Sequence, residues 1–265
     1  MLKLGWFSTG RGEGSRGFLK LVQDRIQTGE LDARIEFVFS NREPSEAEGS
    51  DLFFKLVESY GLPLVTLSSQ RYRREHGGGP MSRHRGPFHD EVIQLISKFQ
   101  TDISVLAGYM LITSPEMCRQ FPMINLHPAL PKGPAGTWQQ VIWKLIEEKA
   151  DESGVMFHVA TEVLDGGPVL TYCSFPIRGG DYDTLWQEVD SRAIEEIKAE
   201  GEEQPLFKQI RQDGAIREGP LLLATLKALV DGRLKVLSGQ VLDSSGAPVD
   251  GMCLNDEIGR FLKPA

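Results

Sequence analysis

The sequence predicts an α/β protein built on a mostly parallel central sheet flanked by helices. Short apolar runs typical of buried strands alternate along the chain with longer segments of helical periodicity, which is the pattern of βαβ units. At 265 residues, with 40% hydrophobic and 25% charged residues, the chain is long enough to bury a substantial core. We find no internal repeat or linker, and we expect one continuous domain over residues 1–237 with a C-terminal hairpin and tail, 238–265, packed on it.

The composition argues against several classes of protein. The formal net charge of −8 is unfavourable for a general binder of nucleic acid or of anionic membranes. The cysteines are widely spaced and the five histidines do not cluster, so the sequence indicates neither a disulfide framework nor a metal site. No apolar run reaches the length of a membrane span, and the N-terminus lacks the pattern of a signal peptide. We therefore expect a cytoplasmic protein that binds small molecules.

The N-terminal segment predicts an anion-binding turn. A buried strand over Leu4–Phe7 precedes a glycine-rich loop over Ser8–Gly17 and an amphipathic helix over Phe18–Gln27. This order places backbone N–H groups and a helix N-terminus around an anion, for which phosphate is the obvious candidate. The glycine spacing fits neither a P-loop nor a dinucleotide fingerprint, so a flexible turn without function is an equal alternative. The candidate phosphate-binding residues are Gly10, Arg11, Gly12, Gly14 and Ser15.

A basic, glycine-rich stretch over 71–85 interrupts the alternation of strands and helices. It contains Arg71, Arg73, Arg74, Arg83 and Arg85 on either side of Glu75–Pro80. A mobile surface loop is the favoured interpretation, because long connections run over the surface. A lid whose arginines meet an anionic group of a ligand is the alternative.

The remaining elements follow from periodicity and from start and stop signals. Strands are predicted at Ile35–Phe39, Leu64–Leu67, Ile103–Ala107, Val155–Val159 and Val169–Phe175, and helices at Leu52–Tyr60, Phe88–Phe99, Thr137–Lys149 and Leu221–Val230. Thr137 is the expected N-cap of its helix, and Gly232 ends the last one. Asp181–Thr184 is expected to open a long helix with an Asp or Thr cap. Leu234–Leu242 is typical of a β-hairpin.

Three polar residues point to chemistry. Asn125 and His127 lie two apart at the end of a predicted strand, Met123–Leu126, and therefore face the same side of it. Asp165 leaves a strand pattern and enters a glycine turn. An amide and a protonated imidazole can stabilise an oxyanion, while a carboxylate can orient the imidazole and assist proton transfer. This set suffices for acyl-group transfer, although His127 taken alone is more often structural.

These residues stand in motifs that resemble the folate-dependent formyltransferases. The motifs are Leu106–Met110, then Asn125–Pro131, then His158 seven residues before Asp165–Pro168. Phe39–Asn41 and Asp231–Lys235 add to the resemblance, which covers roughly residues 1 to 240. Within that family the chain looks closest to the glycinamide ribonucleotide formyltransferases of purine biosynthesis. The resemblance implies a Rossmann-like formyltransferase fold.

The resemblance also implies the reaction and its site. A formyl group would pass from 10-formyltetrahydrofolate, a donor substrate, to the amine of glycinamide ribonucleotide without a metal. Asn125, His127 and Asp165 would be catalytic, the Gly10–Ser15 loop would hold the substrate phosphate, and a glutamate among Glu188, Glu195, Glu196 and Glu218 would bind its ribose. The residues implied for the folate pocket are Met110, Leu111, Ile112, Thr161, Glu162, Val163, Leu164 and Asp165. The partners would be a phosphorylated amine and a reduced folate, and a homodimer is compatible.

Departures from the family pattern keep alternatives open. Leu111 stands where the family often has Arg, Ala129 replaces a serine in a motif one residue short, and the charged stretch at 195–218 is longer than usual. The acceptor could be another amine, such as an amino sugar nucleotide. A formyltetrahydrofolate hydrolase is a further alternative, although that enzyme usually carries an appended N-terminal domain. A rival of another class is a non-catalytic module that binds a phosphorylated metabolite. His158 is equally compatible with a pocket role and a structural one.

Overall fold

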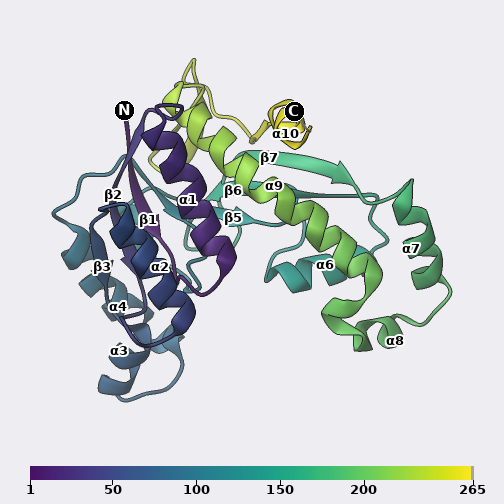
Figure 1. Cartoon of the computed structure of the whole chain (residues 1–265), viewed down its shortest axis with the longest axis horizontal. Coiled ribbons are helices and arrows are strands. Elements are labelled where there is room, and N and C mark those ends of the chain that lie inside the picture. The colour runs from purple at the N-terminus through teal and green to yellow at the C-terminus, as the bar shows by residue number, and fades with distance from the viewer. Residues whose placement is uncertain (264–265) are drawn as a thin grey trace. The chain divides into compact units, whose positions relative to one another are not determined.

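The computed structural model describes residues 1–263 (Figure 1). These residues form two compact units, each held together by contacts within it. Unit 1 comprises Met1–Asn125, Val159–Pro168 and Leu226–Val249. Unit 2 comprises Leu126–His158, Val169–Thr225 and the chain from Asp250 on. Each unit is described below by its own sheet and core.

Unit 1 contains the parallel sheet that the sequence predicts. Its strands are β1 (Leu2–Phe7), β2 (Ala33–Ser40), β3 (Leu64–Thr66), β4 (Ile103–Leu106) and the start of β5 (Met123–His127). They pair in the order β3-β2-β1-β4-β5, and every pair is parallel. Helices α1 (Glu13–Gln27), α2 (Glu48–Ser59), α3 (Ser69–Glu75), α4 (Met81–Ile96) and α5 (Pro115–Gln120) connect them. Parallel strands require such crossover connections, which is why the alternation in the sequence predicted this topology.

An aromatic cluster forms much of the core of unit 1. Phe7, Phe37 and Phe39 come from two adjacent strands, and Phe88 comes from α4. The Phe7 and Phe37 rings meet edge to face, with centroids 5.5 Å apart. Full burial of one such side chain is worth about 1.5–3 kcal/mol. The cluster therefore holds α4 on the sheet and makes the strands beside it rigid.

The predicted loop at 71–85 is wrong, because most of that stretch is helical. It lies on α3 and α4, and only His76–Pro80 connects the two helices. The Ser68 hydroxyl accepts a hydrogen bond from the Arg71 backbone N–H at 3.0 Å and so caps α3. Tyr72 is buried in the aromatic cluster and anchors the helix. The many arginines of this stretch made its amphipathic pattern difficult to recognise from the sequence.

Helix boundaries also differ from the prediction: α2 begins at Glu48 rather than Leu52, and α4 at Met81 rather than Phe88. Helix α1 begins at Glu13 rather than Phe18, so Gly14 and Gly17 are helical. Helix α9 (Pro205–Val230) is far longer than predicted and contains Pro220. Helix α7 (Asp181–Asp190) begins after Gly180, whose φ is +56°, and no side chain caps it. In each case tertiary packing outweighs the local propensity of glycine, proline or a capping residue.

Unit 2 is built on an antiparallel pair of strands. Strand β6 (Glu152–Val159) pairs with β7 (Val169–Pro176), and the two-residue β10 (Met252–Cys253) runs parallel to β7. The helices with at least part of their length in this unit are α6 (Trp138–Glu147), α7, α8 (Ile194–Ala199), α9 and α10 (Asn255–Leu262), with a 3-10 turn at Gly201–Glu203. The charged insertion at 195–218 is thus largely helical.

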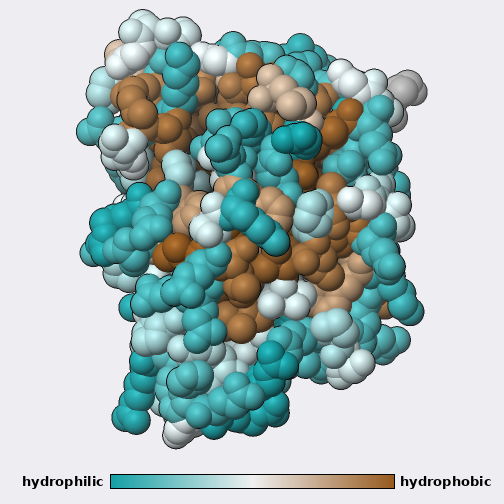
Figure 2. Space-filling view, turned by 90° about the vertical axis from the view of Figure 1, so that its left-hand side faces the viewer, coloured by the Kyte–Doolittle hydropathy of each residue, from teal (hydrophilic) through white to brown (hydrophobic). Residues whose placement is uncertain are grey.

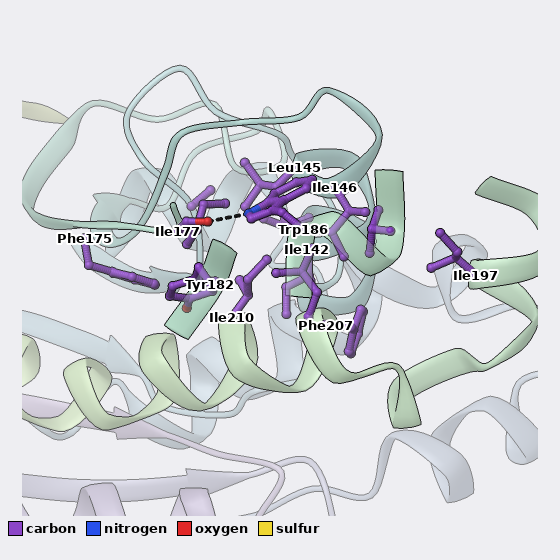
Figure 3. Close-up of a cluster of buried hydrophobic side chains, with 14 residues drawn as sticks. Ile142, Leu145, Ile146, Phe175, Ile177, Tyr182, Trp186, Ile197, Phe207 and Ile210 are labelled. Carbon is purple, nitrogen blue, oxygen red and sulfur yellow. Dashed lines mark hydrogen bonds between the residues drawn. The ribbon is translucent and has the colours of Figure 1, made fainter. Parts of the chain in front are cut away.

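A second hydrophobic cluster joins α6, α7, α8 and α9 to the end of β7, as Figure 3 shows. Trp186 of α7 lies at its centre, and its indole N–H donates to the Ile177 carbonyl at 2.5 Å. Ile142 and Leu145 of α6 pack into the same cluster. The predicted N-cap of α6 is confirmed, since Thr137 and Gln140 form a complete capping box. This box and the apolar face fix α6, which follows the Asn125–Pro131 motif.

The predicted hairpin is confirmed as β8 (Leu234–Leu237) paired antiparallel with β9 (Gln240–Asp243). Ser238 and Gly239 both have positive φ, as a two-residue type I′ turn requires. No helix among residues 1–263 is long and apolar enough to cross a membrane. In the same part of the chain, no three His, Cys, Asp or Glu side chains gather as a set that could hold a metal ion.

Candidate active site

Asn125 and His127 lie at the carboxyl end of β5, as the sequence predicts. Leu106 of β4 is the sheet partner of Asn125, so this strand end adjoins the end of the next parallel strand. Asn125 is half-buried, whereas His127 is only 3% exposed. Because side chains alternate along a strand, residues two apart face the same side. Their backbone positions therefore suit a shared site.

The imidazole of His127 is held from one side by the backbone. Its Nε2 lies 2.8 Å from the carbonyl oxygen of Pro134. A carbonyl can only accept, so Nε2 carries a hydrogen and donates it. The ring of His158, itself buried, meets that of His127 edge to face with centroids 6.3 Å apart. His158 therefore packs beside the candidate catalytic imidazole within unit 2.

Asp165 lies in a closed loop of unit 1 and has the left-handed φ of +52°. The Val159 N–H donates to the Pro168 carbonyl and joins the two ends of the loop at 2.9 Å. A Cβ on Gly167 would overlap the Val159 carbonyl oxygen, so only glycine allows this closure. The Ala160 N–H donates to the Met123 carbonyl at 2.8 Å. The loop that carries Asp165 is thereby tied to the strand that carries Asn125.

Four large apolar side chains of unit 1 are exposed on two loops implied for the folate. Met110 and Ile112 follow β4, while Val163 and Leu164 precede Asp165. Met110 is 65% exposed and Val163 66%. Figure 2 shows how hydrophobic residues gather in patches on one face, bordered by hydrophilic ones. These loops offer apolar surface to a flat ring.

The other residues implied for the folate behave differently. Leu111 is partly buried against the aromatic cluster, so it serves the core as well. The Glu162 carboxylate accepts from Arg119 at 2.6 Å, and the Thr161 hydroxyl donates to the Val163 carbonyl at 3.2 Å. These contacts support the loop.

The N-terminal loop is shorter and more rigid than the sequence suggests. The Gly10 N–H already donates to the Ser8 hydroxyl at 3.1 Å, and its φ is +69°. Arg11, Gly12 and Gly14 are exposed at the start of α1, while Ser15 is buried against Gly108. The first N–H groups of a helix lack partners within it. Of the residues predicted to bind an anion, Gly14 and Ser15 lie in the first turn of α1, and Gly10, Arg11 and Gly12 precede the helix.

Two contributors were missed by the sequence analysis. The Thr9 hydroxyl donates to the Asn41 side chain at 2.7 Å and accepts from the Met110 N–H at 2.9 Å. Thr9 thus joins the anion-binding turn to the loop after β4. The signal was present in Asn41, a polar residue directly after a buried strand.

The second missed residue is Arg211, which binds one of the four candidate glutamates. Glu195 and Glu196 are exposed, and the Glu188 side chain is 46% exposed. The Glu218 side chain is only 12% exposed and lies 2.5 Å from the Arg211 guanidinium. Glu218 is thus the least exposed of the four, and the charge of Arg211 alone could not have indicated its partner.

The residues at the strand end suit acyl-group transfer, and comparison with known proteins identifies the class to which this chain belongs. The family model described as formyl transferase matches residues 11–194, which is more than half of the chain. The chain belongs to this family and is a folate-dependent formyltransferase, as predicted. The fold is likewise confirmed as that of the family.

Particular relatives carry more specific names. The chain is 29% identical over 174 residues to phosphoribosylglycinamide formyltransferase of Escherichia coli, covering 64% of this chain and 72% of that protein. It is 30% identical over 187 residues to the Saccharomyces cerevisiae protein of the same name, covering 66% and 84%.

Solved structures share the fold at lower identity. Phosphoribosylglycinamide formyltransferase of Coxiella burnetii matches with a TM-score of 0.66 and 21% identity, over 95% of this chain and 98% of that one. A formyltetrahydrofolate deformylase of Pseudomonas syringae matches with a TM-score of 0.62 and 21% identity, over 91% and 65%. The fold therefore does not distinguish the two reactions.

Proposed function

We propose that this enzyme transfers a formyl group from 10-formyltetrahydrofolate to the primary amine of glycinamide ribonucleotide. The observation that carries the proposal is the strand end of β5. Asn125 and His127 lie there two residues apart, and the Asp165 loop is tied to the same strand through Ala160 and Met123. The names of the relatives at 29% and 30% identity support this acceptor.

The proposed reaction begins when the acceptor amine attacks the formyl carbon. The carbonyl electron pair moves to oxygen, and Asn125 and the imidazolium of His127 donate hydrogen bonds to the oxyanion. Because Pro134 accepts from Nε2–H, protonation at Nδ1 completes the imidazolium. Asp165 balances that charge and, through water, accepts the proton released by the attacking nitrogen. Collapse of the oxyanion then breaks the bond from carbon to N10 of the folate, and N10 takes up the proton that the attacking nitrogen released.

The substrates would be held by separate parts of the chain. The exposed Met110, Ile112, Val163 and Leu164 offer the apolar surface that a pterin ring requires. The first turn of α1 offers backbone N–H groups and the positive end of a helix dipole to the acceptor phosphate. Glu218 is our candidate for the acceptor ribose, because it is the least exposed of the four glutamates.

A different amine acceptor is the second candidate function. The segment from α8 to the start of α9 bears the charge of the long insertion and contributes Arg211 next to Glu218. An altered acceptor subsite would change which amine is bound while leaving the chemistry at β5 intact.

Release of tetrahydrofolate is the measurement that tests the proposal. We expect release that requires glycinamide ribonucleotide and that falls by about 10²–10⁴-fold in Asp165→Asn, because a positioned acid–base group contributes that much. Asp151→Asn, which changes an exposed carboxylate, is the matched control. Release without the amine would identify a hydrolase. Full activity of Asp165→Asn would contradict the proposed role of Asp165.

A further inference from the structure

An arginine from the charged insertion pairs with the glutamate that we assign to the acceptor. Arg211 and Glu218 lie seven residues apart on α9, and their Nη1 and Oε1 atoms are 2.5 Å apart. Seven residues of α-helix rise about 10 Å, so the arginine must extend along the helix to reach its partner. Gly214 lies between them, three residues after Arg211 on the same face of the helix.

A second contact fixes the position of the guanidinium. It lies over the Trp138 ring of α6, 4.9 Å from the centroid, and Trp138 in turn packs against Phe207. Arg211, Trp138 and Pro128 also line one small cavity of about 10 Å³, enough for roughly one water molecule. Pro128 directly follows His127 in the chain. The arginine is therefore held next to the candidate catalytic strand end within unit 2.

The pairing changes what Glu218 can recognise. A lone carboxylate repels an acceptor that carries phosphate, whereas the Arg–Glu pair is neutral. Oε1 is occupied by Arg211, which leaves Oε2 to accept from the acceptor substrate. A sugar hydroxyl can donate a hydrogen bond to that oxygen.

We propose that Arg211 is a positioning residue: it orients the Glu218 carboxylate so that its free oxygen can accept a hydrogen bond from a hydroxyl of the acceptor sugar. This inference rests on the proposed function and adds a residue that sets the geometry of the same site. The long charged insertion then has a role, because it supplies the arginine that sets the geometry of the acceptor subsite.

Steady-state kinetics with Arg211→Gln tests the inference. We expect the KM for glycinamide ribonucleotide to rise at least about 10-fold, because losing a hydrogen bond to a charged group weakens binding by about that factor. The kcat and the KM for the folate should stay the same. Arg211→Lys should recover part of the loss by keeping the charge. Arg217→Gln is the matched control, since Arg217 also lies on α9, pairs with Asp213 and stacks on Phe175, and it should leave the KM unchanged.

A double-mutant comparison shows whether Arg211 acts through Glu218. If it does, adding Arg211→Gln to Glu218→Gln will raise the KM no further. Additive effects, an unchanged KM in Arg211→Gln, or an equal rise in Arg217→Gln would overturn the inference.

Failure of the proposed function is a separate result. If the unaltered enzyme does not formylate glycinamide ribonucleotide, calorimetry with ribose 5-phosphate and 2-deoxyribose 5-phosphate decides the inference. The inference is supported if the enzyme binds the deoxy sugar more weakly than ribose 5-phosphate, and if Arg211→Gln but not Arg217→Gln weakens the binding of ribose 5-phosphate. It is refuted if the affinities for the two sugars are equal, or if Arg211→Gln and Arg217→Gln bind ribose 5-phosphate equally well.

Discussion

Asp165 illustrates how backbone conformation and chemistry coincide at single residues. Its φ of +52° lies in the left-handed region, which aspartate tolerates better than most residues because its short side chain can bond locally. The glycine-rich turn next to it closes only because Gly167 has no Cβ. If Asp165 acts as we propose, a carboxylate in so constrained a loop would be oriented before substrate arrives, which would lower the reorganisation needed during reaction.

Asn125 gives the sharpest prediction at this scale. We expect Asn125→Ala to lower kcat by about 10²–10³-fold, because the loss of one preorganised oxyanion donor has that effect. The KM values should change little. The measurement is tetrahydrofolate release under saturating substrates.

Asn255→Ala provides the control for that experiment. Asn255 is an exposed amide that accepts from the Ser174 N–H at 2.8 Å and donates to the Ser174 hydroxyl. Its loss should leave kcat unchanged. A comparable decrease in both variants would show that the effect of Asn125 is not specific to the site.

At the scale of elements, the α3–α4 hairpin is an unusual concentration of positive charge. Arg71 forms ion pairs with Glu43 and Glu75. Within residues 1–263, the four others, Arg73, Arg74, Arg83 and Arg85, form no ion pair. In a chain of net charge −8, such a group is typical of a surface that meets an anion. Its ordered helices also make it a better-defined surface than a mobile loop.

We expect this hairpin to contact the anionic tail of the folate. Replacement of Arg73 and Arg74 by Gln should raise the KM about 3- to 10-fold for a donor with a γ-linked oligoglutamate tail, and should leave the KM for the monoglutamate nearly unchanged. Raising the salt concentration should have the same selective effect. The ratio of the two KM values is the measurement. Arg34→Gln, on β2, is the control, and an equal change in both donors would contradict the assignment.

At the scale of the whole molecule, stability in acid depends on a buried histidine in unit 1. His89 of α4 is fully buried, and its Nε2 lies 3.1 Å from the Tyr109 hydroxyl. Burial lowers the pKa of His89 to about 4. The positive charge of Arg85 also lowers this pKa, whereas the backbone of Arg85 raises it. The same burial raises the pKa of Tyr109. The native protein therefore keeps His89 neutral where the unfolded chain would protonate it.

The direction of the pH effect follows from that difference. Between pH 6.5 and about 4 the unfolded chain binds a proton that the native state does not, so the free energy of unfolding falls as the pH falls. The loss should reach about 3 kcal/mol near pH 4. Urea unfolding of the native protein and of His89→Phe across this range is the measurement. The variant should show a shallower fall, and identical slopes would contradict this role of His89.

Local patterns were sufficient for the parallel sheet, the hairpin and the Thr137 cap. A run such as Ile103–Leu106 must be buried on both faces, and Ser238-Gly239 suits a tight turn, so short-range chemistry specifies these elements. The placement of Asn125 and His127 on one strand end followed from the same alternation. The motif spacing also identified the formyltransferase family before any contact was known.

Other features depended on residues far apart in the chain. The stretch at 71–85 is helical because Tyr72 finds an aromatic cluster drawn from several elements, and α1 keeps its early glycines because the loop before it is bonded to Asn41 and Gly108. Arg211 is oriented by Trp138, which lies 73 residues away and on another helix. Such contacts form only when the chain is folded, and they are what convert a list of polar residues into a site of defined geometry.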